Sequence, residues 1–194
     1  MPMKKIILIL AIFLAGCASA PKSINNACAV FDQRDGWVNN WHKDAKKAER
    51  DFGVPVPILM ATIYTESSFQ PYARPPRTTL LGFIPWKRQS SAYGYSQALD
   101  GTWARYTRET GRMGASRTNF GDAIHFIGWY HKQSNVTNGI SLSDPYNLYL
   151  AYYSGHGGYA KGSWRGNAMV QRAARKATNI SQRYAAQLRN CGRL

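Results

Sequence analysis

The sequence predicts a single domain that is mainly α-helical. The chain has 194 residues, enough to build one hydrophobic core. Apolar residues recur at helical spacing through most of it, and residues that begin or end helices separate the periodic stretches. No stretch of useful length alternates apolar and polar residues as a half-buried strand does, and no internal repeat is evident.

Residues 1–16 have the features of an export signal. Lysines precede a short apolar run and small residues follow it, a pattern too short for a membrane-spanning helix. The stretch LAGC at 14–17 resembles the bacterial lipobox, which implies that residues 1–16 are removed and that Cys17 carries lipid. Such a lipid anchors a protein without spanning the membrane. The alternative is an ordinary signal peptide, cleaved near Ala18 or Ala20.

The predicted domain, residues 28–194, follows a small, polar tether at 17–27. A first helix is expected at 37–52, where apolar residues face one side and charged residues the other, and Gly53 ends it. Prolines suit the first turn of a second helix at about 55–68.

Four more helices are expected further along the chain. Asp100, Asn119 and Asp144 are each expected to begin one of them, and Pro145 suits a first helical position. Gly155 is expected to end the third of these helices. The predicted ranges are 100–111, about 119–134, 144–155 and about 167–188.

Residues 74–91 interrupt the helical pattern. They contain three prolines, a glycine and four basic residues. We therefore expect a small irregular or β excursion at about 74–91.

The charge of the chain favours a polyanionic partner. The chain has twenty-five Lys and Arg residues and ten Asp and Glu residues, which gives a formal net charge of +15. Nucleic acid would be the usual interpretation of such a charge, but an exported protein rarely meets it. Anionic membrane headgroups and the carboxylates of the bacterial wall are the partners that remain.

The cysteines left after lipidation are Cys28 and Cys191, at the two ends of the predicted domain. In an oxidising compartment this arrangement predicts a disulfide that ties the ends together. Two free, buried thiols are the alternative.

Glu66 is the acidic residue that helix starts and charged helix faces leave unexplained. It follows an apolar run, and Ile63 and Leu59 precede it at helical spacing, so the carboxylate is expected on or beside the buried face. Burial without a basic neighbour raises a carboxyl pKa, which suits a general acid. The alternative is a glutamate at a helix end that points into solvent.

Other kinds of site are poorly supported. The four histidines have no metal-ligand spacing, and no phosphate-binding loop or nucleophile elbow occurs. Ser154 precedes Gly155 and His156 but lacks a plausible acidic third member of a triad. We therefore expect no metal site.

Three motifs, in order, resemble those of lysozyme-like lytic transglycosylases of the soluble catalytic-domain type. Residues 66–73 (ESSFQPYA) resemble E-S-x-F-x-P-x-A, and residues 92–97 (AYGYSQ) are similar to A-x-G-L-M-Q. Residues 151–155 (AYYSG) are similar to A-Y-N-A-G. The resemblance covers about 55–160 and implies a lysozyme-like fold.

The resemblance implies a role for each matching position. Glu66 matches the catalytic acid and base, and Ser67 the residue that supports its helix end. Leu99 falls where the family has an apolar cleft residue. Replacement of Leu, Met and Asn of the motifs by Tyr95, Ser96 and Tyr153 implies an altered, more aromatic cleft. The expected substrate-binding residues are Ser67, Tyr95, Gln97, Tyr152 and Tyr153.

The implied chemistry needs one carboxylate and no cofactor. Glu66 would protonate the oxygen between N-acetylmuramic acid and N-acetylglucosamine, and then accept a proton from the C6 hydroxyl as it attacks C1. The product would be a 1,6-anhydro end on the peptidoglycan strand. A goose-type hydrolytic lysozyme and a non-catalytic wall-binding lipoprotein are the alternatives. The lipid on Cys17, followed by Ala18, implies the periplasmic face of the outer membrane.

Overall fold

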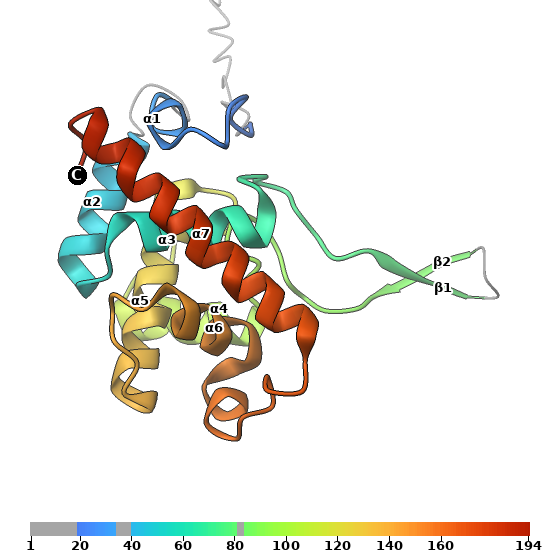
Figure 1. Cartoon of the computed structure of the whole chain (residues 1–194). Coiled ribbons are helices and arrows are strands. Elements are labelled where there is room, and N and C mark those ends of the chain that lie inside the picture. Colours follow the sequence, from blue (N-terminus) through green and yellow to red (C-terminus); the bar gives the residue numbers. More distant parts are fainter. Residues whose placement is uncertain (1–18, 34–39, 81–83) are drawn as a thin grey trace, which may run out of the picture.

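The computed structural model describes residues 19–33, 40–80 and 84–194. Within them it confirms a mainly α-helical fold with one small β-hairpin (Figure 1). The signal and Cys17 lie outside the described residues. The elements are α1 (Ala27–Val30), α2 (Trp41–Phe52), α3 (Val56–Ser67), β1 (Arg77–Leu80), β2 (Ile84–Arg88), α4 (Asp100–Thr110), α5 (Phe120–Asn138), α6 (Pro145–Ala160) and α7 (Ala168–Asn190).

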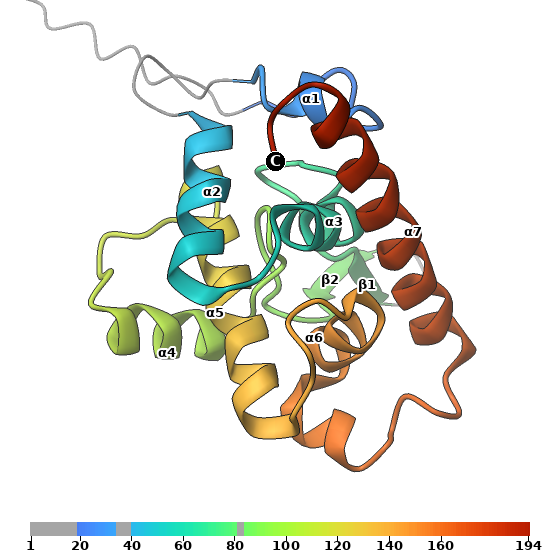
Figure 2. The same cartoon turned by 60° about the vertical axis from the view of Figure 1, so that its left-hand side comes forward.

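Helix α3 forms the centre of the domain. Its sequence is apolar on all sides, and its residues from Val56 to Ile63 are buried, as expected of a helix enclosed by others. It packs against α2, α5 and α7, and Figure 2 shows it between α2 and α7. Next to it, Trp41 stacks on Phe120 with ring centroids 4.0 Å apart. This aromatic core fixes the helix whose last turn carries Glu66.

Most predicted helix ends are confirmed, because they depend on local hydrogen bonds. The side chains of Asn119 and Asp144 accept backbone N–H groups at the starts of α5 and α6. The prediction for Asp100 is wrong: it is the first residue of α4, and its carboxylate pairs with Arg117 at 2.8 Å. At Gly155, where a helix end was predicted, the backbone does leave the helical conformation, with a φ of 72° and a ψ of 158°; beyond this kink a further helical stretch of α6 continues to Ala160. Helix α2 begins at Trp41, and the predicted residues 37–39 lie outside the described residues.

The excursion at 74–91 contains an antiparallel hairpin. Strands β1 and β2 pair Arg77 with Arg88 and Leu80 with Ile84, with an irregularity between Arg77 and Thr79. The hairpin extends away from the helices (Figure 1). The expectation of a small β excursion is therefore confirmed.

The two ends of the domain are held together beside α7. Cys28 and Cys191 form a disulfide across a sequence separation of 163, which confirms the predicted bridge. The backbone N–H of Ala27 donates to Gln187 at 2.9 Å. The tyrosine hydroxyl of Tyr184 donates to the carbonyl of Ile24. The last residues of the predicted tether are therefore docked on α7 and belong to the fold. Among the described helices, none is long and apolar enough to cross a bilayer.

Candidate active site

Glu66 lies in the last turn of α3, is half-buried, and receives a hydrogen bond from a tyrosine. The hydroxyl of Tyr149, on α6, donates to its Oε1 at 2.8 Å. Among the residues that the structure describes, Glu66 makes no ion pair. Burial raises the pKa of Glu66 from 4.5 to about 7, although the Tyr149 hydrogen bond acts in the opposite direction. Near neutral pH this carboxyl group can therefore both give and accept a proton.

Tyr149 was missed by the sequence analysis. It is buried, and its burial and the Glu66 carboxylate raise its pKa above the ordinary value of 10.0. The phenol therefore remains a hydrogen-bond donor. A signal was present in the sequence, because Tyr149 precedes the motif residue Tyr152 by three positions and so shares its side of the helix.

The backbone after Glu66 adopts an unusual conformation. Ser68 and Phe69 have φ angles of 52° and 59°, in the left-handed region that favours glycine. The ring of Phe69 is fully buried and stacks beside Trp41, at 6.1 Å between centroids. The core thus holds the turn that fixes the end of α3.

Ser67 connects this helix end to the second motif. Its buried hydroxyl donates to the carbonyl oxygen of Tyr95 at 2.8 Å and approaches that of Ile63 at 3.2 Å. The side chain therefore supports the helix end, as the resemblance implies. Because its hydroxyl is engaged within the protein, this geometry does not favour a direct contact of Ser67 with substrate.

The loop of the second motif is built around two left-handed residues. Gly94 has a φ of 75°, and a Cβ atom there would lie 2.1 Å from the carbonyl oxygen of Arg117. Gln97 has a φ of 50°. Its Nε2 donates to the carbonyls of Ala73 and Gly94, at 2.9 and 2.8 Å. This bonding holds the motif loop against the chain that follows Glu66.

Tyr95 does not occupy the place that the motif comparison implied. Its side chain is 0% exposed and packs edge-on against Trp41 and Phe120, at 5.6 and 6.0 Å between ring centroids. The ring therefore contributes to the hydrophobic core, where its edge-on contacts with other aromatic rings are favourable. This burial does not favour the direct contact of Tyr95 with substrate that the sequence analysis expected.

A cavity of about 240 Å³ lies between the second and third motifs. Tyr153 and Leu99 are half-exposed along it, at 49% and 48%. Tyr152 donates to the carbonyl of Ser96 at 2.6 Å. Tyr152 follows Tyr149, the donor to Glu66, by three positions on α6, so this wall lies near Glu66. Burial and the Glu66 carboxylate raise the pKa of Tyr152 well above its ordinary value. The lining residues are Gln97, Ala98, Leu99, Thr102, Phe126, Tyr130, Tyr152, Tyr153, Ser154 and Gly155.

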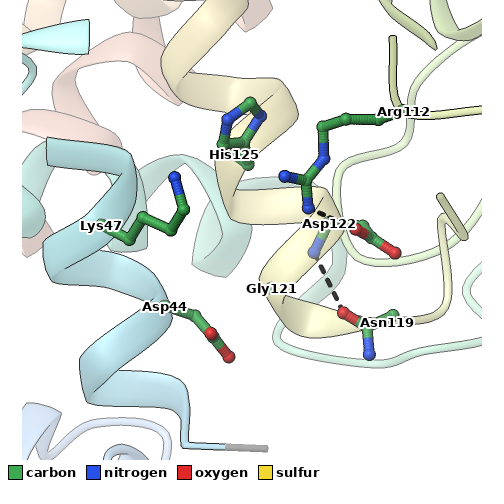
Figure 3. A pocket seen from close by; sticks show the side chains of 7 residues that line it. All are labelled: Asp44, Lys47, Arg112, Asn119, Gly121, Asp122 and His125. Atoms are coloured by element: carbon green, nitrogen blue, oxygen red, sulfur yellow. Dashed lines mark hydrogen bonds and ion pairs between the residues drawn. The ribbon is translucent and has the colours of Figure 1, made fainter. Parts of the chain in front are cut away.

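A second cavity, of about 270 Å³, lies between α2 and α5 (Figure 3). Arg112 reaches into it and pairs with Asp122 at 2.8 Å. Nearby, Asp51 accepts from Lys47 at 2.6 Å and lies 3.3 Å from His125. The cavity is lined by Asp44, Lys47, Arg112, Asn119, Gly121, Asp122 and His125.

Burial and neighbouring charges together shift the pKa values of Asp51 and His125 beside this second cavity. Burial raises the pKa of Asp51, but Lys47 and His125 outweigh it and the pKa is lowered overall. Burial and then Arg112 lower the pKa of His125 to about 4, against the attraction of Asp51. The groups are thus held in one protonation state near neutral pH. Among the described residues, no cluster of three or more His, Cys, Asp or Glu side chains could hold a metal ion.

Comparison with known protein families matches residues 5–191 to the family described as Transglycosylase SLT domain. No curated protein matches the chain significantly. The family match covers the motifs around Glu66, Gln97 and Tyr152 and extends to both sides of them.

Proposed function

Because the chain belongs to the transglycosylase SLT domain family, we propose that Glu66 serves as its single catalytic acid and base. The fold is lysozyme-like, and the activity of such a domain is lytic transglycosylation of peptidoglycan. The bond cleaved would be the β-1,4 bond between N-acetylmuramic acid and N-acetylglucosamine. The observation that carries this proposal is a half-buried Glu66 with a pKa of about 7.

In the first step, protonated Glu66 gives its proton to the glycosidic oxygen. The C1–O bond breaks with its electron pair passing to the oxygen, so N-acetylglucosamine leaves with a new hydroxyl group and positive charge develops at C1 and its ring oxygen. A carboxyl group with a pKa of about 7 is substantially protonated at neutral pH, whereas an ordinary glutamic acid is almost fully ionised. Burial of Glu66 therefore supplies the acid form that this step needs.

In the second step, the C6 hydroxyl oxygen of muramic acid bonds to C1, and the Glu66 carboxylate accepts the proton that this hydroxyl loses. This closes the 1,6-anhydro ring and returns Glu66 to its acid form. Tyr149 donates to the carboxylate at 2.8 Å and would stabilise it between the two steps. Most glycosidases use two carboxylates, but none of the described residues that line the adjacent cavity is acidic, which favours a mechanism with one.

Gln97, Tyr152 and Tyr153 are the proposed substrate contacts, because they line the cavity next to Glu66. Ser67 would affect catalysis by holding the end of α3 in position. Tyr95 is not among the proposed contacts, because it is buried. No metal or cofactor enters the proposed steps.

The proposal includes export and a lipid anchor. Residues 1–16 would be a lipoprotein signal, and Cys17 would carry the lipid, with the domain following at 28–194. The enzyme would act on the periplasmic face of the outer membrane. These assignments are supported by the signal-like sequence and by a peptidoglycan substrate, which lies outside the cytoplasm.

Digestion of purified sacculi tests the proposed reaction. We expect the protein to release muropeptides with 1,6-anhydro ends, identified by mass spectrometry, and Glu66→Gln to lower the rate at least about a hundredfold. Glu109→Gln is the matched control, because Glu109 is exposed and its only described ionic partner is Arg105; it should retain full activity. Reducing ends would indicate a hydrolytic lysozyme, and no release would indicate a binding protein. Full activity of Glu66→Gln would show the site assignment to be wrong.

A further inference from the structure

The C-terminal part of the chain carries an unbalanced positive charge. Residues 145–194 contain eight Lys or Arg residues and no Asp or Glu. Four of these cations, Arg172, Arg175, Lys176 and Arg183, are exposed along one side of α7. Their spacing of three, four and eleven residues from Arg172 keeps them on the same face of a helix.

These cations line a groove between α3 and α7, of about 520 Å³, which we call the α7 groove. The ring of Tyr64 forms its other wall, with the Lys176 ammonium 5.3 Å and the Arg183 guanidinium 6.0 Å from the ring centroid. The remaining lining residues are Arg172, Arg175, Asn179 and Ile180.

None of the four cations is neutralised by a carboxylate within the described part of the chain. Of the ten acidic residues, only Asp35 lies outside that part. A concave surface with several unpaired cations concentrates anions. Arginine forks bind phosphate oxygens with two parallel hydrogen bonds, and a tyrosine ring suits the boundary between apolar and aqueous phases.

The chain enters the domain at the edge of this groove. Asn25 accepts from the Tyr64 hydroxyl at 2.9 Å and from Arg183 at 3.3 Å. Asn25 is eight residues after Cys17, and eight extended residues span at most about 29 Å. A lipid on Cys17 would therefore keep this edge of the α7 groove within about 30 Å of the bilayer.

The groove and the Glu66 carboxylate lie on different sides of α3. Tyr64 and Glu66 are two positions apart, which is about 200° around a helix. Accordingly Tyr64 faces α7, whereas Glu66 contacts Tyr149 on α6. A surface bound at the groove would leave Glu66 available to a glycan strand.

From the groove, its charge and the position of Asn25, we infer that the α7 groove binds anionic phospholipid headgroups and holds the domain against the membrane. The inference rests on the lipid anchor included in the proposed function. The short tether favours lipid over the carboxylates of wall peptides as the occupant, because it brings one face of the domain to the bilayer and that face carries the unpaired cations.

Amine footprinting of the full-length processed protein tests this inference. The protein is incorporated into vesicles of phosphatidylcholine alone or of phosphatidylcholine with phosphatidylglycerol, and acetylation of each lysine is measured by mass spectrometry. We expect Lys176 to react several-fold more slowly in the anionic vesicles and to recover in high salt. Lys43, an exposed residue of α2, should react equally in both, because Figure 2 shows α2 on the opposite side of α3 from α7.

A charge-matched pair of variants shows whether the groove itself is responsible. Arg172→Gln/Arg175→Gln should abolish the protection of Lys176, whereas Arg50→Gln/Arg108→Gln should leave it unchanged. The second pair removes the same charge from exposed arginines that form no ion pair among the described residues. Equal effects of the two pairs would overturn the inference, since general charge would then explain the protection.

The remaining outcomes separate this inference from the proposed function. Equal Lys176 reactivity in both vesicle types overturns it, and so does protection by a soluble acidic wall peptide without protection by lipid. The intact mass of the same sample shows whether Cys17 carries lipid. If it does not, vesicles added from outside still test the groove, and its protection by phosphatidylglycerol would support the headgroup site without the anchor. Activity on sacculi is measured separately.

Discussion

Two parts of the molecule place carboxylates in opposite electrostatic surroundings. Beside the cavity of Figure 3, Asp122 pairs with Arg112 and Asp51 lies between Lys47 and His125. There the pKa of Asp51 is lowered. At the end of α3, Glu66 accepts a hydrogen bond from the neutral phenol of Tyr149 and makes no ion pair among the described residues, and its pKa rises to about 7. The comparison teaches that an exposed carboxylate beside a cation stays ionised, whereas a buried carboxyl group beside a neutral phenol can keep its proton near neutral pH.

This comparison predicts opposite pH dependences of stability for two neutralising variants. The folded-state pKa of Glu66 exceeds its ordinary value of 4.5, so its contribution to stability is full below pH 4.5 and is lost as pH rises through about 7. The free energy of unfolding of Glu66→Gln should therefore increase relative to that of wild type as pH rises, by up to about 3 kcal/mol in alkaline solution. Urea unfolding followed by circular dichroism at several pH values measures the difference.

Asp51→Asn supplies the matched opposite case. The pKa of Asp51 is lowered, so its stabilising effect is present above its ordinary value of 3.8 and is lost as pH falls through the lowered pKa. This variant should be less stable than wild type at neutral pH, and the difference should disappear in acid. The same pH dependence in both variants would contradict the comparison.

A smaller effect is expected when the hydrogen bond from Tyr149 to Glu66 is removed. Tyr149→Phe should raise the pKa of Glu66, because the phenol stabilises its carboxylate. The rate should fall about tenfold, corresponding to one hydrogen bond to a charged group. The alkaline limb of the pH–rate profile should move to higher pH. Tyr146→Phe is the control, because it removes a half-buried phenol on the same helix; it should change neither the rate nor the alkaline limb. A lower rate with an unmoved limb would indicate that Tyr149 has only a packing role.

Local patterns predicted much of the fold. Asn119 and Asp144 begin helices through bonds to residues three positions away, which the sequence displays directly. The burial of Glu66 likewise follows from the helical spacing of Ile63 and Leu59. The prediction for Asp100 was wrong because a local pattern does not show distant partners: its carboxylate pairs with Arg117, 17 positions along the chain.

What the sequence did not predict depends on contacts between distant segments. The bond from Tyr149 to Glu66 joins residues 83 positions apart. The inward orientation of Tyr95 depends on Trp41 and Phe120, which are far from it in sequence. A motif comparison aligns such a loop residue but does not say which way its ring faces, because the packing around it decides.

The most direct test of the account is the pKa of Glu66 itself. Carbon-detected NMR of the side-chain carboxyl group follows the titration in the folded protein, with Glu66→Gln assigning the signal. We predict a midpoint near pH 7, well above that of the exposed Glu109. A midpoint close to the ordinary 4.5 would contradict the central claim that burial without a cation keeps this carboxyl group protonated for catalysis.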